Sequence, residues 1–209
     1  MPERVIPLFP LRVVVFPRTR LPLHIFEERY KKMVGEAIRD SSEFGIVLAR
    51  EEGIVNAGCT VAVEKLVQMY PDGRMDILTL GRRRFEVESL DEELEFLRAH
   101  VNFFDDDDFE PIAPELRDEA LANFRLLCEL EESEEQDDAD LEDPQLSFQL
   151  AQNLPDVDFL SGLLRRRSEP ARLKELNRYL ANYIPRQKII QHVKSVAPRN
   201  GHGGTHLGI

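Results

Sequence analysis

The chain has 209 residues and a formal net charge of −12, and 42% of its residues are hydrophobic, which suffices for one globular domain with a smaller companion. No apolar run approaches the roughly 20 residues needed to span a bilayer, and the first residues lack the pattern of a signal peptide, so we expect a cytoplasmic protein with no membrane contact. Cys59 and Cys128 are too few and too far apart for a disulfide framework or a metal cluster.

Four prolines interrupt the first apolar stretch of the chain. Pro7, Pro10, Pro17 and Pro22 lie within a run that otherwise reads as β-strand. Proline has no backbone N–H to donate and is excluded from central strands. We therefore expect this ribbon to bend from one sheet edge to another, with the prolines at its corners, and to wrap the rim of a barrel.

One helix and several short strands follow this ribbon. The helix is predicted from apolar residues that share one face: Phe26, Tyr30, Met33, Val34 and Ala37. Strands are predicted over residues 44–49, 60–70, 74–85 and 97–103. Pro71-Asp72-Gly73 supplies the turn of a hairpin between the second and third of these strands. The pattern predicts a small mixed, largely antiparallel barrel.

Beyond Pro114 the apolar residues recur with a helical period. Three stripes predict helices: Leu116, Ala120, Phe124 and Leu127; Leu146, Leu150 and Leu154; Leu173, Leu176, Leu180 and Ile184. We expect the prolines at 144, 155, 170 and 185 at helix starts or at breaks between helices. The sequence thus predicts an α+β chain, with a barrel over residues 1–112, a bundle of four or five helices over 113–198 and a disordered tail over 199–209.

The acidic residues are concentrated in the middle of the chain. Residues 105–143 hold 18 acidic and 2 basic side chains, whereas residues 165–199 hold ten lysines and arginines against two glutamates. Blocks of like charge repel one another and stay extended. We therefore expect a mobile acidic linker near residues 129–143, beside a basic helical region.

The N-terminal ribbon resembles a known family. "PLFPLRVVVFP" (7–17) followed by "LPLHIFEERYKKMV" (21–34) is similar to the start of the Lon protease N-terminal domain, a substrate-binding domain with a PUA-like pseudobarrel. The segments "FGIVLARE", "AGCTVAVEKL", "DGRMDILTLGRRRFEV", "LSFQLAQNLP" and "ARLKELNRYL" resemble its later parts, so the likeness spans about residues 5–196. One departure is Arg18, which follows Pro17 where members of the family commonly carry a glycine.

We predict no catalytic site. Lon enzymes continue into an ATPase module and a serine–lysine protease, but the chain has no G-x-x-x-x-G-K-[ST] phosphate loop. Ser168 and Ser195 each adjoin a basic residue in sequence and would not face it across a helix. His202 and His206 lie in a glycine-rich tail that builds no helical face. We therefore expect no catalytic, cofactor-binding or metal-binding residue, and no cofactor.

The resemblance implies a non-catalytic module that binds polypeptides. We expect a cleft between barrel and bundle to hold unfolded or extended segments, through main-chain hydrogen bonds along a strand edge and shallow apolar pockets. A protease or a chaperone in trans is a second kind of partner that the resemblance allows. The candidate contact residues are Phe9, Phe16, Leu21 and Leu23.

RNA binding is the alternative, because PUA-like barrels include RNA-binding modules and the chain has arginine triplets at 82–84 and 165–167. Such phosphate contacts would weaken steeply with salt. A pI near 5.0 and the acidic stretch argue against a nucleic acid partner, because they repel a polyanion. Dimerisation through the helical half is compatible with polypeptide binding, so a homo-oligomer stays open.

Overall fold

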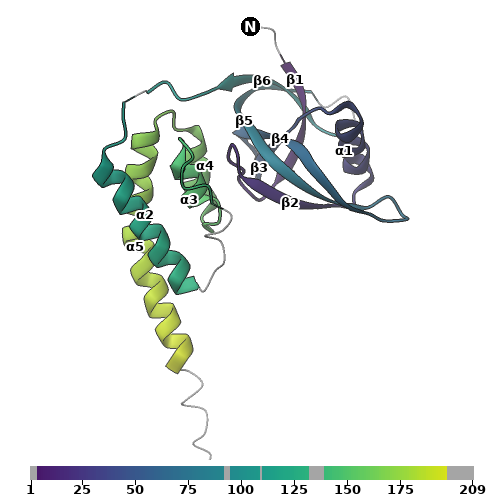
Figure 1. The fold of residues 1–209 in the computed structure, drawn as a ribbon. Coiled ribbons are helices and arrows are strands. Elements are labelled where there is room, and N and C mark those ends of the chain that lie inside the picture. Colours follow the sequence, from purple (N-terminus) through teal and green to yellow (C-terminus); the bar gives the residue numbers. More distant parts are fainter. Residues whose placement is uncertain (1–3, 92–94, 109, 132–138, 197–209) are drawn as a thin grey trace, which may run out of the picture.

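The computed structural model describes residues 4–91, 95–108, 110–131 and 139–196 (Figure 1). The strands are β1 (Arg4–Leu11), β2 (Arg20–Ile25), β3 (Phe44–Arg50), β4 (Gly53–Met69), β5 (Met75–Asp91) and β6 (Arg98–Phe104). The helices are α1 (Glu28–Asp40), α2 (Pro114–Glu131), α3 (Leu146–Ala151), α4 (Val157–Arg165) and α5 (Glu169–Val196). The predicted tail and part of the predicted acidic linker, residues 132–138, lie outside the described residues.

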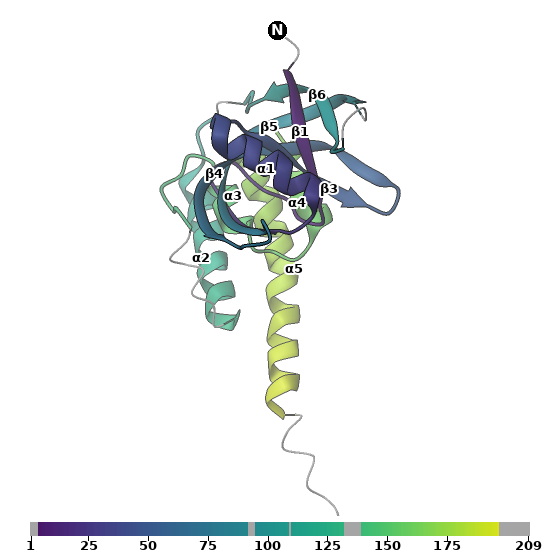
Figure 2. The same ribbon diagram turned by 90° about the vertical axis from the view of Figure 1, so that its right-hand side faces the viewer.

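The strands form one mixed sheet that closes on itself. Their order is β2-β5-β4-β3-β1-β6, and β5 also pairs with β6. The strands β5, β4, β3, β1 and β6 therefore form a ring, and β2 pairs with the first part of β5. β1 runs parallel to β3, and the other recorded pairings are antiparallel. α1 lies on the side of the barrel away from the later helices (Figures 1 and 2). The α+β fold with a largely antiparallel barrel is confirmed.

The proline-rich ribbon changes strand partner, as predicted, but two of its four prolines are not where we expected them. The first half of β1 pairs with β6 and the second half with β3. Pro7 lies where β1 changes partner, as predicted, because it is the last residue paired with β6. Pro10 lies inside β1 and Pro22 inside β2, so the prediction that prolines occupy the corners is wrong for these two. β2 ends the strand order, and an edge strand tolerates a missing donor. Pro17 does lie in a turn.

The predicted hairpin between β4 and β5 is confirmed, and the N-terminal loop packs directly on it. A Cβ atom at Gly81 of β5 would lie 1.9 Å from the carbonyl oxygen of Phe16. The backbone N–H of Arg18 donates to the Gly81 carbonyl, and the Gly81 N–H donates to the carbonyl of Thr19. Only a residue without a side chain allows this close approach.

The first helix confirms most of its predicted face. α1 buries Tyr30, Met33, Val34 and Ala37. Phe26 was predicted on the same face, and that prediction is wrong, because Phe26 precedes the helix and is 60% exposed. The helix therefore covers the barrel with one turn less than expected.

The helical half follows the predicted stripes, with one exception at a proline. Pro144 and Pro155 precede α3 and α4, and Pro170 is the second residue of α5, as predicted. Pro185 neither starts nor breaks a helix, because α5 runs through it. The buried face of α5 is formed by Leu173, Leu176, Leu180 and Ile184. Across the described residues, no helix combines the length and the apolar character needed to pass through a membrane.

Candidate functional site

Two of the four predicted contact residues belong to the core. Phe9 is 7% exposed, and its ring lies 4.1 Å from that of Tyr30, measured between centroids. Phe16 is fully buried and stacks on Phe148 of α3, with ring centroids 4.6 Å apart. Their burial corrects the expectation that they line an exposed groove. Both side chains instead hold other elements against the strands.

The other two predicted residues lie on β2 and are half-buried. Leu21 and Leu23 pack against the edge of the main core. In the strand register Leu23 lies opposite Ile77 of β5, and Leu66 of β4 lies opposite the same residue on its other side. The sheet thus brings Leu23 into one row with Leu66, a residue that the sequence reasoning did not select.

The far end of β4 is an open strand edge. β4 pairs with β3 only up to Val61, whereas its pairing with β5 continues to Met69. In the part of the chain that the structure describes, residues 62–69 therefore have a strand neighbour on one side only. Three large apolar side chains stand exposed here, with Leu66 at 41%, Val67 at 58% and Met69 at 53%. An exposed apolar edge is a template for pairing with another chain.

A groove runs between this edge and the end of α1. Its volume is about 390 Å³, in the range of sites that hold several side chains. Apolar atoms of Ile38, Val63 and Leu66 contribute to its lining. The remaining lining residues are small or polar: Ala37, Ser41, Ser42, Ala62, Glu64, Lys65 and Arg82. An extended chain paired to β4 would place alternate side chains into this groove.

The rim of the groove carries charges of both signs. The guanidinium of Arg20 donates from Nε to Glu64 Oε2 at 2.8 Å, and this hydrogen bond lowers the pKa of the Glu64 carboxyl. Lys65 and Arg82 lie nearby on β4 and β5. The rim therefore carries no single sign of charge.

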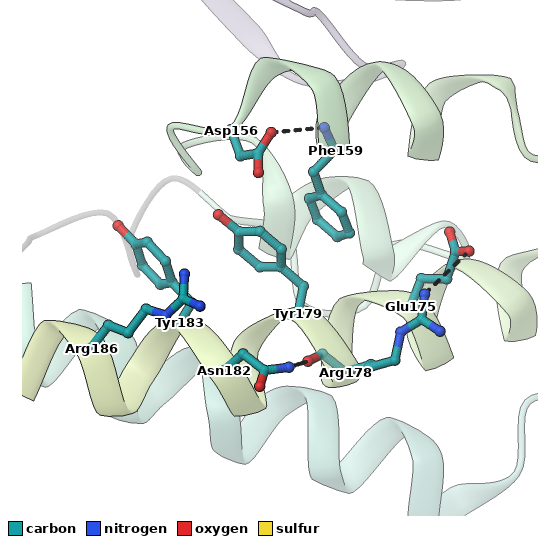
Figure 3. Close-up of a pocket in the computed structure, with 8 residues that line it drawn as sticks. All are labelled: Asp156, Phe159, Glu175, Arg178, Tyr179, Asn182, Tyr183 and Arg186. Atoms are coloured by element: carbon teal, nitrogen blue, oxygen red, sulfur yellow. Dashed lines mark hydrogen bonds and ion pairs between the residues drawn. The ribbon is translucent and has the colours of Figure 1, made fainter.

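A second groove lies between the start of α4 and the outer side of α5 (Figure 3). Its volume is about 330 Å³. Tyr179 lies between the rings of Phe159 and Tyr183, at centroid distances of 4.1 and 5.5 Å. Burial raises the pKa of Tyr179 to about 12, so its hydroxyl stays protonated at neutral pH. Arg178 and Arg186 flank these rings.

The cleft expected between barrel and bundle is a charged one. A groove of about 310 Å³ lies where β3 and the turn after it approach α4. An ion pair between Arg50 and Asp158 crosses it. Arg12, Glu51 and Glu52 also line it. Leu48, Ala49 and Val157 give this cleft an apolar part as well. The open edge of β4 adds a run of backbone groups that pair on one side only, so it fits the expected binding mode better than this cleft does.

The two arginine triplets are partly engaged within the protein. Arg84 is 1% exposed and donates from Nη2 to Asp106 Oδ1 at 2.7 Å, so it has no access to a phosphate. Arg166 donates from Nε to Glu175 Oε2 at 2.9 Å. These contacts withdraw Arg84 and pair Arg166 with a carboxylate, whereas Arg82, Arg83 and Arg165 are exposed, so only part of the two triplets is lost to RNA binding.

Cys59 and Ser168 have no catalytic surroundings among the described residues, and the side chain of Ser195 lies outside them. Burial raises the pKa of the Cys59 thiol to about 12, so little reactive thiolate forms. Ser168 donates its hydroxyl hydrogen to Asp108 at 2.5 Å, next to the start of α5. Within the described ranges, no group of three or more histidine, cysteine, aspartate or glutamate side chains could hold a metal ion. His202 and His206 lie outside those ranges.

Comparison with known proteins supplies the family. A family model of the ATP-dependent protease La (LON) substrate-binding domain matches residues 5–191. The chain belongs to this family. The Lon protease of Parabacteroides distasonis is 28% identical over 110 residues, which cover 48% of this chain and 13% of that protein. The Lon protease of Anaeromyxobacter dehalogenans is 30% identical over 141 residues, 60% of this chain and 17% of that protein.

Solved structures agree with this assignment to the Lon family. A Lon N-terminal domain protein from Xanthomonas campestris superposes with a TM-score of 0.67 at 26% identity, over 83% of this chain and 96% of that one. The N-terminal domain of a Mycobacterium avium complex Lon protease gives 0.62 at 14% identity, over 85% and 98%, and so shares the fold. The resemblance drawn from the sequence is confirmed. The chain spans less than a fifth of the length of the Lon proteases that it matches.

The sequence reasoning missed the exposed residues of β4. Leu66 and Val67 are adjacent, so they break the two-residue alternation of a half-buried strand shortly before the turn at 71–73. That break was the available signal. Its meaning depends on where β3 stops pairing, which no local pattern reveals.

Proposed function

We propose that this Lon-type domain binds unfolded or extended polypeptide segments along the open edge of β4 and does not cleave them. The observation that supports this most is the edge at residues 62–69, unpaired on one side, with Leu66, Val67 and Met69 exposed along it. Main-chain pairing supplies affinity that is indifferent to sequence. Shallow apolar contacts add weak selectivity, about 1–3 kcal/mol per methylene-sized difference.

The shape of the edge limits how much of a client it holds. Register shifts between Val63 and Lys65 and between Leu66 and Gln68 mark irregular pairing with β5, and bulges of this kind twist a strand. A client strand can follow such an edge for a few residues only. We therefore propose short, reversible capture, which suits a protein that delivers clients rather than storing them.

We further propose that a protease or a chaperone acting in trans receives these clients. The family match covers a substrate-binding domain, so cleavage is assigned here to another protein. A reducing compartment such as the cytoplasm suits the chain, because Cys59 and Cys128 are both buried and form no disulfide.

The proposal is tested with reduced, carboxymethylated α-lactalbumin as the unfolded polypeptide. Val67→Lys places a charge on the open edge, and we expect it to weaken binding about tenfold in a fluorescence anisotropy titration, because lysine blunts strand edges. Leu90→Lys is the matched control, since Leu90 is 45% exposed on the far end of β5. It should bind like the unmodified chain.

Three results would contradict the proposal. Equal binding by the Val67→Lys and Leu90→Lys variants would remove the edge from the account. Binding to a mixed RNA pool that disappears with salt, without binding to the polypeptide, would favour the alternative function. Cleavage of casein in the presence of ATP would contradict the non-catalytic role.

A further inference from the structure

The outer side of α5 carries a heptad pattern. Tyr179, Tyr183, Arg186, Ile190 and Val193 follow one another at spacings of four, three, four and three residues. This is the spacing at which the side chains of one helix meet a second, packed helix. We call these five residues the outer seam. An extended chain, with its two-residue period, would not match it.

The lower half of the outer seam points away from the helices that α5 packs against, whereas at the upper half Tyr179 stacks on Phe159 of α4 and Tyr183 donates its hydroxyl hydrogen to Glu131 of α2. Val193 follows the buried Ile184 by about two and a half helical turns, so the two side chains lie on opposite sides of α5. On the inner side, Gln191 donates to the carbonyl of Leu130 in α2. Both views show the last turns of α5 extending past the end of α2 (Figures 1 and 2).

The lower half of the seam is strongly apolar and exposed. Ile190 is 45% and Val193 is 59% exposed, and the neighbouring Ile189 is 65% exposed. At the upper half, Tyr179 and Tyr183 border the groove beside α4 (Figure 3). That groove offers a recess for a large side chain of a partner, as a hole receives a knob in helix packing. The apolar stripe formed by Ile190 and Val193 and the groove beside α4 therefore lie along the same side of α5.

A positive charge stands in the middle of this apolar line. Arg186 is exposed and makes no hydrogen bond or ion pair with any described residue. Arg178, which also lines the groove, has a side chain that is 79% exposed, and its Nη2 lies 4.0 Å from Glu175 Oε1. A partner that covers the seam must therefore supply a negative charge opposite Arg186, since an uncompensated charge at a helix interface opposes association.

This charge also argues against a second copy of the chain as the occupant. A two-fold antiparallel pairing that matches the apolar ends, Tyr179 against Val193, places Arg186 opposite its own counterpart. In a two-fold contact, the residue at the axis meets the same residue of the other copy. The two Arg186 guanidiniums would therefore repel each other in that register. The chemistry favours a different, acidic partner.

We infer that the outer seam docks an amphipathic helix of a partner protein, with an apolar contact stripe and a glutamate or aspartate facing Arg186. This surface is separate from the client edge on β4 and recognises a helix rather than an extended chain. It would fix the domain to a folded partner while β4 holds a client. The inference goes beyond client capture, and it can fail while client capture holds.

The test uses the full chain and two synthetic helical peptides of about three heptads, with isoleucine at a and leucine at d. One peptide carries glutamates at e and g, and the other carries lysines there. In fluorescence anisotropy titrations we expect the acidic peptide to bind at least about tenfold more tightly than the basic one. Arg186→Glu should reverse this preference.

A second pair of variants tests the apolar part of the seam. Ile190→Ser should weaken the binding of the acidic peptide about tenfold, because the substitution removes one large apolar contact. Leu90→Ser, which removes a similarly exposed side chain elsewhere, should leave binding unchanged. Circular dichroism checks that each variant is folded. Binding of carboxymethylated α-lactalbumin should be the same for all of them.

Several outcomes would overturn the inference. These are equal binding of both peptides, no binding of the acidic one, and an unchanged preference in Arg186→Glu. A dimer in analytical ultracentrifugation that Ile190→Ser abolishes would show that a second copy covers the seam. A parallel loss of peptide and α-lactalbumin binding would show that the seam is not a separate site.

Discussion

Arg18 holds a backbone conformation that residues with side chains rarely adopt. Its φ is 61°, in the left-handed region, in the turn where the N–H of Thr19 donates to the carbonyl of Phe16. Its guanidinium donates from Nε and Nη2 to the two carboxylate oxygens of Asp143, at 2.5 and 2.6 Å. Asp143 is almost fully buried. The ion pair ties the loop after β1 to the segment that leads into α3 and offsets the backbone strain.

Replacing Arg18 separates the strain from the ion pair. Arg18→Gly and Arg18→Ala both remove the partner of Asp143, which we expect to lower the free energy of unfolding by about 2 kcal/mol. Alanine keeps the unfavourable φ, so it should lose about 1 kcal/mol more than glycine. Urea unfolding measures both, with Arg12→Ala in the same loop as control. Equal losses for the two variants would mean that the φ carries no strain.

Pro185 lies in the middle of α5 without ending it. Proline removes one helical hydrogen bond and crowds the carbonyl four residues earlier. Leu180 and Ile184, which precede the proline, are buried, and after it Gln191 donates to the Leu130 carbonyl of α2, so tertiary contacts hold the helix together across the proline. Local preference favoured a break at this position, and the buried face before the proline together with the contact of Gln191 with α2 overrides that preference.

Pro185→Ala is expected to stabilise the chain. Pro185 is exposed, so the substitution loses little packing, and it restores a backbone donor. We expect the free energy of unfolding to rise by about 2 kcal/mol. Lys188→Ala, also exposed on α5, should change it by less than about 0.5 kcal/mol. A lower stability for Pro185→Ala in urea unfolding would show that the packing of α5 requires the proline.

The periodic spacing of apolar residues in the sequence predicted the helices and strands well, and long-range contacts explain what it missed. The α1 face, the hairpin at 71–73 and the stripe on α5 each depend on residues close in sequence. The open edge of β4 depends on where β3 stops, and the conformation of Arg18 depends on Asp143. An apolar residue such as Phe9 suits both a core position and a binding surface, so the spacing of apolar residues does not distinguish the two roles.

The strands and the helices are joined through two buried guanidiniums. Arg84 of β5 is 1% exposed and Arg172 of α5 is fully buried, and both donate to Asp106. Their guanidinium carbons lie 5.4 and 4.3 Å from the centre of the Phe148 ring. This joint keeps β5 and α5 in a fixed relation. The predicted division of the chain at residue 112 into separate domains stays a prediction.

Because Asp106 must be ionised to hold this joint, the free energy of unfolding depends on pH in the acid range. Burial alone would raise the pKa of Asp106, but hydrogen bonds from Arg172, Gln145 and Arg84 lower it to about 2. The ordinary value in an unfolded chain is about 3.9. The stabilisation, about 2 kcal/mol, is therefore complete above the unfolded value and is lost as the pH falls from about 4.5 to about 2.

Asp106→Asn tests this pH dependence. We expect the free energy of unfolding of the unmodified chain to fall over that acid range, and that of Asp106→Asn to be lower at pH 7 and to change less with pH. Asp105→Asn, an exposed neighbour, is the control and should follow the unmodified chain. Equal slopes for Asp106→Asn and the unmodified chain in urea unfolding would contradict the assignment of the effect to Asp106.

The central claim for the whole molecule is that clients pair with the open edge of β4. Amide hydrogen exchange of the full chain, with and without carboxymethylated α-lactalbumin, tests it most directly, because main-chain pairing protects amides wherever it forms. We predict slower exchange within residues 62–69 and no change along α5. Protection that appears elsewhere and leaves residues 62–69 unchanged would contradict the account.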